Sequence, residues 1–305
     1  MQKAIWSDIE RSAKKDLAGL IFRSEKYFDR QVEAVADDIF DKKHVRVVMI
    51  AGPSSSGKTT FSKLLNEKLR NKGVMVHYIG MDDFFIDRDK VPFLPSGVRD
   101  FDSPETLDME LLRKVIGGVL DSEWVEIPEY DFIAGKRKEE KTILRLHDED
   151  VVIIEGIHAL NPMIIGRNDS QIAKISIKPR KTFIMPSGRK LEPDELRLLR
   201  RTIRDFHTRG YGFEQTAEQW EEVCIAESKY ITPYTDYADY FIDSAFDYEL
   251  FIYKQCIGKS LDDCRIEEYE NIKNVLDEVA LIPITEIPKT SLLNEFAINP
   301  AVVSD

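Results

Sequence analysis

Short apolar runs alternate with stretches of helical periodicity along most of the chain. Runs rich in Val and Ile have the length of buried parallel strands, and the segments between them carry apolar residues every three or four positions. This alternation predicts an α/β fold with a mostly parallel sheet flanked by helices. The expected strands are residues 45–51, 74–80, 151–155, 172–178 and 238–243. The expected helices are residues 60–70, 191–209 and 214–230, with another helix beginning at Pro104 and more helix to about residue 277.

The pattern divides the chain into three expected regions. Residues 1–43 are expected to form a helical N-terminal extension, and residues 44–282 the main domain. Residues 283–305 form a proline-containing C-terminal tail with little periodicity, which we expect to lie against the body or to be partly disordered. The apolar face expected in the N-terminal helix is Phe28, Val32, Val35 and Ile39.

One pair of strands departs from the parallel pattern. Residues 124–132 alternate between polar and apolar positions, a charged turn follows at residues 135–141, and residues 142–147 alternate again. We therefore expect a β-hairpin.

The composition describes a soluble chain with room for one large domain and an appendage. Its 305 residues are 43% hydrophobic and 32% charged. No apolar run approaches the roughly 18 residues that a membrane span needs, and the start is not signal-like. Three cysteines without metal-ligand spacing favour reduced thiols in the cytoplasm. The net charge of −12 argues against general nucleic-acid binding, and positive charge for an anionic ligand must be concentrated locally.

Residues 52–59 match the pattern G-x-x-x-x-G-K-[ST] between an expected strand and an expected helix. Gly52 and Gly57 allow backbone angles at which successive N–H groups point into one concavity at the positive end of the helix. Lys58 adds a charge for the β- and γ-phosphates, and the Thr59 hydroxyl can ligate Mg²⁺. The sequence therefore predicts a nucleoside triphosphate site. Its binding residues are Gly52, Ser54, Ser55, Ser56, Gly57, Lys58, Thr59 and Thr60.

Carboxylates follow two of the expected strands, at the end where ligands bind in parallel α/β sheets. Asp82 and Asp83 come after residues 74–80, and one of them, Asp82 first, could accept the proton of an attacking hydroxyl and contact Mg²⁺. Otherwise the two are solvated turn residues. Glu155 closes the apolar run 151–155, where an acid is costly without a partner. We expect it to hold the metal rather than to be an exposed strand end.

The helix expected at residues 191–209 has one apolar and one basic face. The apolar face is Leu196, Leu199, Ile203 and Phe206, and the basic face is Arg197, Arg200, Arg201 and Arg204. Four guanidinium groups on one face repel one another unless anions neutralise them, and Arg side chains suit phosphate oxygens. With a hinge at residues 210–212, this pattern predicts a lid over about residues 186–212 that closes on phosphates, rather than a solvated helix.

Asp102 and Arg99 lie just before the helix that Ser103 and Pro104 are expected to start. They could cap that helix or bind a substrate, and the residues alone leave both interpretations open.

Assembled in order, these motifs resemble the uridine kinase/phosphoribulokinase family of P-loop small-molecule kinases over about residues 45–245. The resemblance implies a P-loop NTPase fold in which the hairpin binds substrate and the arginine-rich helix is a lid. It also implies Mg²⁺ and ATP or GTP as phosphoryl donor. The motifs are GPSSSGKT at 52–59, MDDFF at 81–85, FDSP at 101–104, PEYDF at 128–132, VIIEG at 152–156, RRTIRD at 200–205 with Arg209-Gly210, and YAD at 237–239.

The resemblance implies roles for individual residues. Asp82 matches the catalytic base that activates the sugar 5′-hydroxyl, and Glu155 matches the metal-linked carboxylate. Asp102 matches the acid that binds ribose hydroxyls, which favours substrate binding over capping. The implied catalytic residues are Asp82, Lys58, Arg201 and Arg204, and the implied metal residues are Thr59, Asp82 and Glu155. The implied substrate residues are Asp102, Tyr130, Arg137 and the lid residue Arg209.

Two positions depart from the pattern of uridine–cytidine kinases. Gly135 stands where they usually have a histidine that reads the pyrimidine, and Tyr211 stands where they have a second lid arginine. The loss of a hydrogen-bonding reader weakens base discrimination, and Gly135 is expected to open the base pocket. In these positions, and in residues 287–296, the chain is similar to the kinase half of uridine kinase-like proteins fused to threonyl-tRNA synthetase-like domains.

The expected function is ATP- or GTP- and Mg²⁺-dependent phosphorylation of the primary hydroxyl of a nucleoside, with uridine as the first candidate. One alternative is a kinase for another ribose- or polyol-bearing small molecule. Another is a nucleotide-binding regulatory module with little turnover. A cytoplasmic protein with a small-molecule substrate and no membrane partner is expected, and homo-oligomerisation is left open.

Overall fold

A five-stranded parallel sheet forms the centre of the protein, in the order β10-β7-β2-β6-β3. The computed structural model describes residues 2–93, 97, 99–165 and 170–296. The strands are β2 (Val47–Ala51), β3 (Val76–Gly80), β6 (Val151–Glu155), β7 (Ile172–Lys178) and β10 (Tyr240–Asp243). All five strands expected from the apolar runs are therefore present, and the mostly parallel sheet is confirmed.

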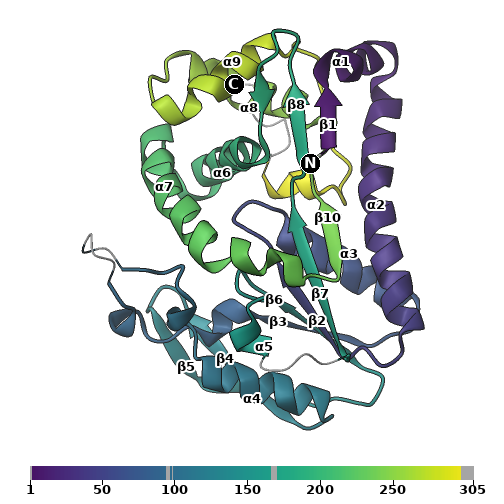
Figure 1. Ribbon diagram of the computed structural model, residues 1–305, viewed down its shortest axis with the longest axis vertical. Helices are drawn as coiled ribbons and strands as arrows, with labels where there is room; N and C mark the ends of the chain where they lie inside the picture. The colour runs from purple at the N-terminus through teal and green to yellow at the C-terminus, as the bar shows by residue number, and fades with distance from the viewer. Residues whose placement is uncertain (1, 94–96, 98, 166–169, 297–305) are drawn as a thin grey trace.

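Both faces of the sheet are buried, which explains the continuous apolar runs. In β2, Val48 and Ile50 belong to one hydrophobic cluster, whereas Val47 and Met49 belong to the other. The first cluster includes residues of α2 (Leu17–Asp41), α3 (Lys58–Asn71) and α8 (Glu249–Asp262). The second includes residues of α4 (Met109–Leu120), α5 (Pro162–Ile165) and the hairpin strand β4 (Val125–Asp131). Figure 1 shows α4 and the hairpin at one end of the molecule and α1, α8 and α9 at the other.

The expected hairpin is confirmed, because β4 pairs in antiparallel fashion with β5 (Lys136–Leu144). The remaining helices are α6 (Pro193–Arg209), α7 (Phe213–Tyr230) and α9 (Glu270–Glu278). Among the described residues, no helix combines the length and the apolar character needed to cross a bilayer.

The N-terminal segment contains a strand that its sequence did not reveal. β1 (Gln2–Ile5) pairs with β8 (Lys181–Ile184), and β8 pairs with β9 (Lys190–Leu191), which makes a second, three-stranded sheet. The segment is otherwise helical, in α1 (Trp6–Lys15) and α2. Its apolar residues join the same core as α3 and the central sheet. The division of the chain at residues 44 and 282 stays a prediction, but the N-terminal segment is packed into the body.

Two expected details of the helices are wrong. Pro104 starts only a 3₁₀ turn, Pro104–Thr106, and α4 begins at Met109 because the Asp108 carboxylate caps it by accepting the Leu111 N–H at 3.0 Å. Phe206 does not belong to the buried face of α6, because it is 56% exposed.

The described part of the C-terminal tail lies against the body. The 3₁₀ turn Leu292–Glu295 contains two fully buried leucines. Residues 297–305 lie outside the described residues.

Candidate active site

The P-loop connects β2 to α3 and forms one wall of a cavity of about 480 Å³. Ser55 and Gly57 take positive φ angles of 59° and 91°, which turn the chain around the N-terminus of α3. Lys58 Nζ donates to the Gly52 carbonyl at 2.8 Å. Burial lowers the pKa of Lys58, against the opposing effect of Glu155 and other carboxylates. The predicted residues that line this cavity are Ser54, Ser55, Ser56, Gly57, Lys58, Thr59, Asp82, Asp102, Glu155, Arg201, Arg204 and Arg209.

Two carboxylates reach the cavity from the ends of neighbouring strands. Asp82 lies in the turn after β3, and burial raises its pKa while Lys58 lowers it. Asp83 does not line the cavity and accepts the backbone N–H of Tyr130 at 3.3 Å. Glu155 ends β6 beside β3, and its carboxylate lies 3.4 Å from the Thr59 hydroxyl. Of the first two acids, only Asp82 is placed to meet a ligand of the P-loop.

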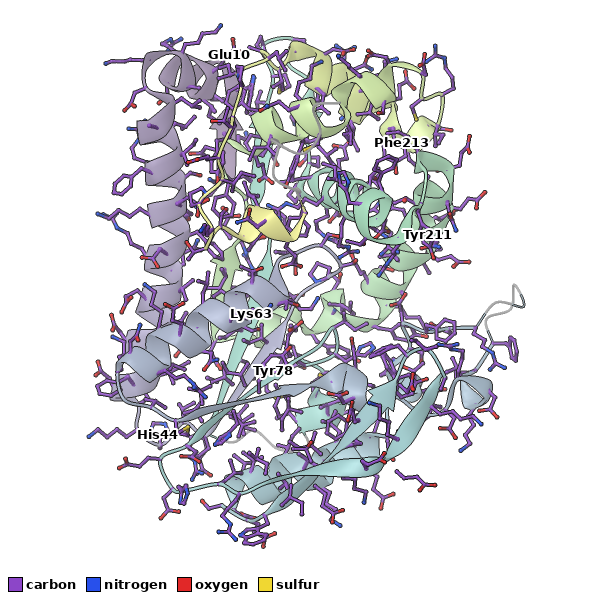
Figure 2. The ribbon with its side chains drawn as sticks, turned by 180° about the vertical axis from the view of Figure 1, so that it is seen from behind. Glu10, His44, Lys63, Tyr78, Tyr211 and Phe213 are labelled. Carbon is purple, nitrogen blue, oxygen red and sulfur yellow. The ribbon has the colours of Figure 1, made fainter. Side chains whose placement is uncertain are left out.

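Tyr78 is a cavity residue that the sequence analysis missed. It lies on β3 near the centre of the view in Figure 2, and its hydroxyl donates to Glu155 Oε2 at 2.5 Å. The Thr59 hydroxyl lies 3.4 Å from the same oxygen, so the Glu155 carboxylate is held between β3 and the P-loop. Nothing in the sequence pointed to Glu155 as its partner, because Glu155 lies 77 residues away at the end of another strand.

The oxygen atoms at these strand ends fit a magnesium ion. Mg²⁺ prefers hard oxygen ligands and is usually held by one or two carboxylates together with water and phosphate oxygens. Thr59, Glu155 and Asp82 provide such a small set. Among the described residues, no group of three or more His, Cys, Asp or Glu side chains could hold a metal by itself. A metal in this cavity would therefore depend on the nucleotide for part of its coordination.

Asp102 faces the cavity, next to Phe85 and Phe101. Burial raises its pKa, and the nearby Arg201 lowers it. It caps no helix, because Ser103 caps the 3₁₀ turn and Asp108 caps α4.

Arg99 is occupied elsewhere in the loop, because its guanidinium donates to the carbonyls of Asp89 and Val91. Of this pair, only Asp102 is available to a substrate.

The hairpin residues Tyr130 and Arg137 stand behind the cavity wall. The Tyr130 ring packs edge-on against Phe85 with a centroid distance of 5.7 Å. Arg137 pairs with Asp108 at 3.0 Å and donates to the Phe85 carbonyl at 3.0 Å. Neither lines the 480 Å³ cavity, so they support the wall that Phe85 forms.

Gly135 does not leave an open space beside the hairpin, so the expectation that it opens the base pocket was wrong. A Cβ atom at Gly135 would lie 2.9 Å from the guanidinium of Arg88, which fills the position. Gly135 also has a φ of 68°, which favours glycine at this turn. Tyr211, the other departure from the family pattern, lies at the junction of α6 and α7 (Figure 2) and does not line the cavity.

The arginines of α6 divide into two groups, which corrects the expectation of one phosphate-seeking stripe. Arg197 pairs with Glu227, and Arg200 pairs with Glu249 at 2.8 Å. Both arginines are buried, and the Arg200–Glu249 pair is fully so. Their charges are therefore neutralised inside the protein without any ligand.

The second group does face the cavity. Arg201, Arg204 and Arg209 lie within 3.1–3.3 Å of one buried carboxylate, Asp205. Three cations share Asp205, so the side of the cavity formed by α6 carries more positive than negative charge. This is the local positive charge that an acidic protein needs in order to bind a phosphate-bearing ligand.

Two glutamates that the sequence analysis missed contact the P-loop. Glu227 of α7 accepts the Ser54 N–H at 3.3 Å, and Glu295 of the tail accepts the Thr60 hydroxyl at 2.9 Å. Both also line the cavity. They lie 173 and 235 residues from their partners, and no local pattern predicts contacts at such distances.

Comparisons with known proteins agree with this geometry. The chain matches the Phosphoribulokinase / Uridine kinase family over residues 47–165 and 190–250. A uridine kinase of Mycoplasma genitalium is 33% identical over 183 residues, which cover 60% of this chain and 76% of that protein. A uridine kinase of Ligilactobacillus salivarius is 28% identical over 194 residues, which cover 63% and 82%.

A solved structure of a "putative fructose transport system kinase from Silicibacter sp. TM1040" has a similar fold. Its TM-score is 0.51 at 18% identity, and the match covers 69% of this chain and 98% of that one. The P-loop, the strand-end carboxylates and the arginine-lined wall all fall within the matched region of the family. The chain therefore belongs to the phosphoribulokinase/uridine kinase family of small-molecule kinases.

Proposed function

We propose that this protein transfers the terminal phosphate of ATP or GTP to the primary hydroxyl of a nucleoside, with uridine as the first candidate. The observation that carries the proposal is the single cavity that joins the P-loop, Asp82, Glu155 and three arginines of α6. Relatives named uridine kinase, at 28–33% identity, support the class of acceptor.

In the proposed mechanism, Asp82 accepts the proton of the acceptor hydroxyl. Burial raises the pKa of Asp82, which makes it a stronger base than an exposed aspartate. Lys58 and the cavity-facing arginines stabilise the negative charge on the transferred phosphoryl group. Thr59, Glu155 and Asp82 would hold Mg²⁺, which would neutralise charge on the phosphate oxygens.

Asp102 would hold the acceptor by its sugar hydroxyls. Its carboxylate lies on the cavity wall with Phe85 and Phe101, which offer apolar surface to a base or sugar ring. Tyr130 and Arg137 would act through Phe85, whose ring and carbonyl they contact.

A second candidate acceptor is a ribose- or polyol-bearing small molecule other than a nucleoside. The observation in its favour is that neither Gly135 nor Arg88, whose guanidinium fills the space beside it, is among the residues that line the cavity, so this position of the hairpin supplies no reader of a pyrimidine.

The test is a panel of nucleosides, sugar phosphates and other polyols, scored for ADP release with ATP, GTP and Mg²⁺. We expect acceptor-dependent release that is fastest with one class of the panel and is abolished in Lys58→Ala. Transfer to a non-nucleoside alone would select the second candidate. ATP affinity without transfer to any acceptor would contradict both and would support a nucleotide-binding regulatory module.

We also propose a cytoplasmic location, which is supported by three free cysteines, Cys224, Cys256 and Cys264.

A further inference from the structure

A short segment of the C-terminal tail, residues 291–296, crosses the P-loop, and we call it the strap. It lies well beyond residue 250, where the match to the family ends. Figure 2 shows it as the yellow turn next to helix α3. Leu292 and Leu293 are fully buried, and Phe296 is nearly so. The strap is therefore part of the folded body.

Leu292 covers a glycine of the P-loop. A Cβ atom at Gly57 would lie 2.3 Å from Leu292 Cδ1, so the leucine side chain occupies the space over this glycine. Gly57 has a φ of 91°, a conformation that glycine adopts readily, and the strap packs directly over it.

Two other elements hold the strap in place. Ser291 Oγ donates to Glu25 Oε1 of α2 at 2.6 Å, and the Tyr248 hydroxyl donates to the same oxygen. The guanidinium of Arg200 lies 5.0 Å from the centre of the Phe296 ring. With both ends anchored, the side chain between them has a fixed position.

That side chain is Glu295, which lines the same cavity as the P-loop. One of its oxygens accepts the Thr60 hydroxyl at 2.9 Å. A carboxylate at this place would repel phosphate oxygens, so the part of a nucleotide that it suits is a hydrogen-bond donor such as a hydroxyl.

The direction in which a triphosphate binds determines which hydroxyl-bearing part of the nucleotide could reach Glu295. In the proposed mechanism its terminal phosphate would lie beside Asp82 and Glu155. The N–H groups of the P-loop and the N-terminus of α3 would hold the other phosphates, and the nucleoside would follow beyond them. Thr60 belongs to the first turn of α3, so its partner Glu295 would be within reach of a sugar at that end of the phosphate chain.

We propose that Glu295 is a specificity-determining residue for the phosphoryl donor, whose sugar hydroxyls it accepts as hydrogen bonds. The strap then selects ribonucleoside triphosphates over their deoxy forms. This inference rests on the proposed function of the cavity as a nucleotide site.

The test compares equilibrium binding of ATP, 2′-deoxy-ATP and 3′-deoxy-ATP to the full chain by calorimetry, with Mg²⁺ and without acceptor. We expect the wild type to bind ATP about tenfold more tightly than at least one deoxy form, the size of one lost hydrogen bond to a charged group. Glu295→Ala should bind all three equally, and Glu295→Gln should keep part of the preference. Glu286→Gln, an exposed residue of the same tail, is the matched control and should behave as the wild type.

Each contrary result has a distinct meaning. Equal binding of all three nucleotides by the wild type would overturn the role of Glu295 and leave the kinase proposal standing. Tighter ATP binding in Glu295→Ala would also overturn it, because the carboxylate would then only repel phosphate. If the wild type bound no nucleotide, both proposals would fail. Thermal unfolding of each variant separates these results from a loss of fold.

Discussion

The charged side chains of the cavity are partly buried, and burial shifts their pKa values. Burial lowers the pKa of Lys58 and raises those of Asp82 and Asp102, so each group resists its charged form. Such opposed shifts are common where groups are arranged for catalysis. A triphosphate with its metal would supply the counter-charges that these residues lack.

Removal of either the Lys58 cation or the Asp82 base should lower turnover strongly. Lys58→Ala removes the cation beside the moving phosphoryl group, and Asp82→Asn removes the base. Each should lower kcat by on the order of a hundredfold or more. The measurement is steady-state ADP release with the best acceptor of the panel. Unchanged kcat in either variant would exclude that residue from the mechanism.

His158 should make the stability of the protein depend on pH. Burial lowers its pKa to about 4 from an ordinary 6.5. Between these values the unfolded chain binds a proton that the folded one does not, so stability is lost as the pH falls from 6.5 toward 4. His158→Gln cannot titrate, and should gain up to roughly 3 kcal/mol relative to the wild type over that range. Urea unfolding of both proteins at several pH values measures the difference. Parallel pH profiles would contradict the prediction.

At the scale of elements, the arginines of helix α6 have two different roles, although they look alike in the sequence. Arg197 and Arg200 form buried ion pairs, whereas the arginines that follow them along the helix face the cavity. The spacing of charges along the helix could not separate them, because the partners Glu227 and Glu249 are 30 and 49 residues away. Only the folded chain shows which cations are already neutralised.

The two groups of arginines should fail in different ways. Arg200→Ala leaves Glu249 buried and unpaired, and should cost about 3–5 kcal/mol of stability. Arg209→Ala removes a half-exposed cation that faces the cavity. It should lower phosphoryl transfer while it changes stability by about 1 kcal/mol or less. Denaturant unfolding and kcat/KM, measured on both variants, test this division. An inactive but fully stable Arg200→Ala would contradict it.

The sequence predicted the elements in which neighbouring residues show a regular pattern of apolar and polar positions. The five central strands, the P-loop and the β4–β5 hairpin are of this kind. β1, β8 and β9 are two to four residues long and gain their stability from partners far along the chain, so their own residues show no strand pattern. The same reason hid Tyr78, Glu227 and Glu295 as cavity residues. In each case the position of the residue depends on a partner far along the chain, which the local spacing of residues does not reveal.

For the whole molecule, segments outside the family's matched region complete the core. Trp6 is fully buried, and its ring packs against Phe183 and Phe251 at 6.0 and 4.8 Å. α2 runs along the side of the molecule in Figure 1 and packs on α3, the helix that follows the P-loop. The N-terminal segment therefore contributes to the stability of the part that holds the nucleotide site.

Trp6→Ala should therefore destabilise the protein as a whole, by about 3–5 kcal/mol, as loss of a large core side chain does. Phe22→Ala is the matched control, because Phe22 lies on α2 with 63% of its surface exposed and should change stability by about 0.5 kcal/mol or less. Thermal or urea unfolding followed by circular dichroism measures both. A separate, early transition in Trp6→Ala would instead show that the N-terminal segment unfolds alone.

The bond between Thr60 and Glu295 joins residues 235 positions apart. During synthesis, the P-loop therefore leaves the ribosome long before Leu292 can settle over Gly57. A nascent chain that has not yet reached residue 291 holds a phosphate cradle without its cover, free to sample other backbone angles. The last part of the pocket to form is supplied by residues that are translated 235 positions after Thr60, so a complete nucleotide site requires synthesis to have passed the 291–296 segment.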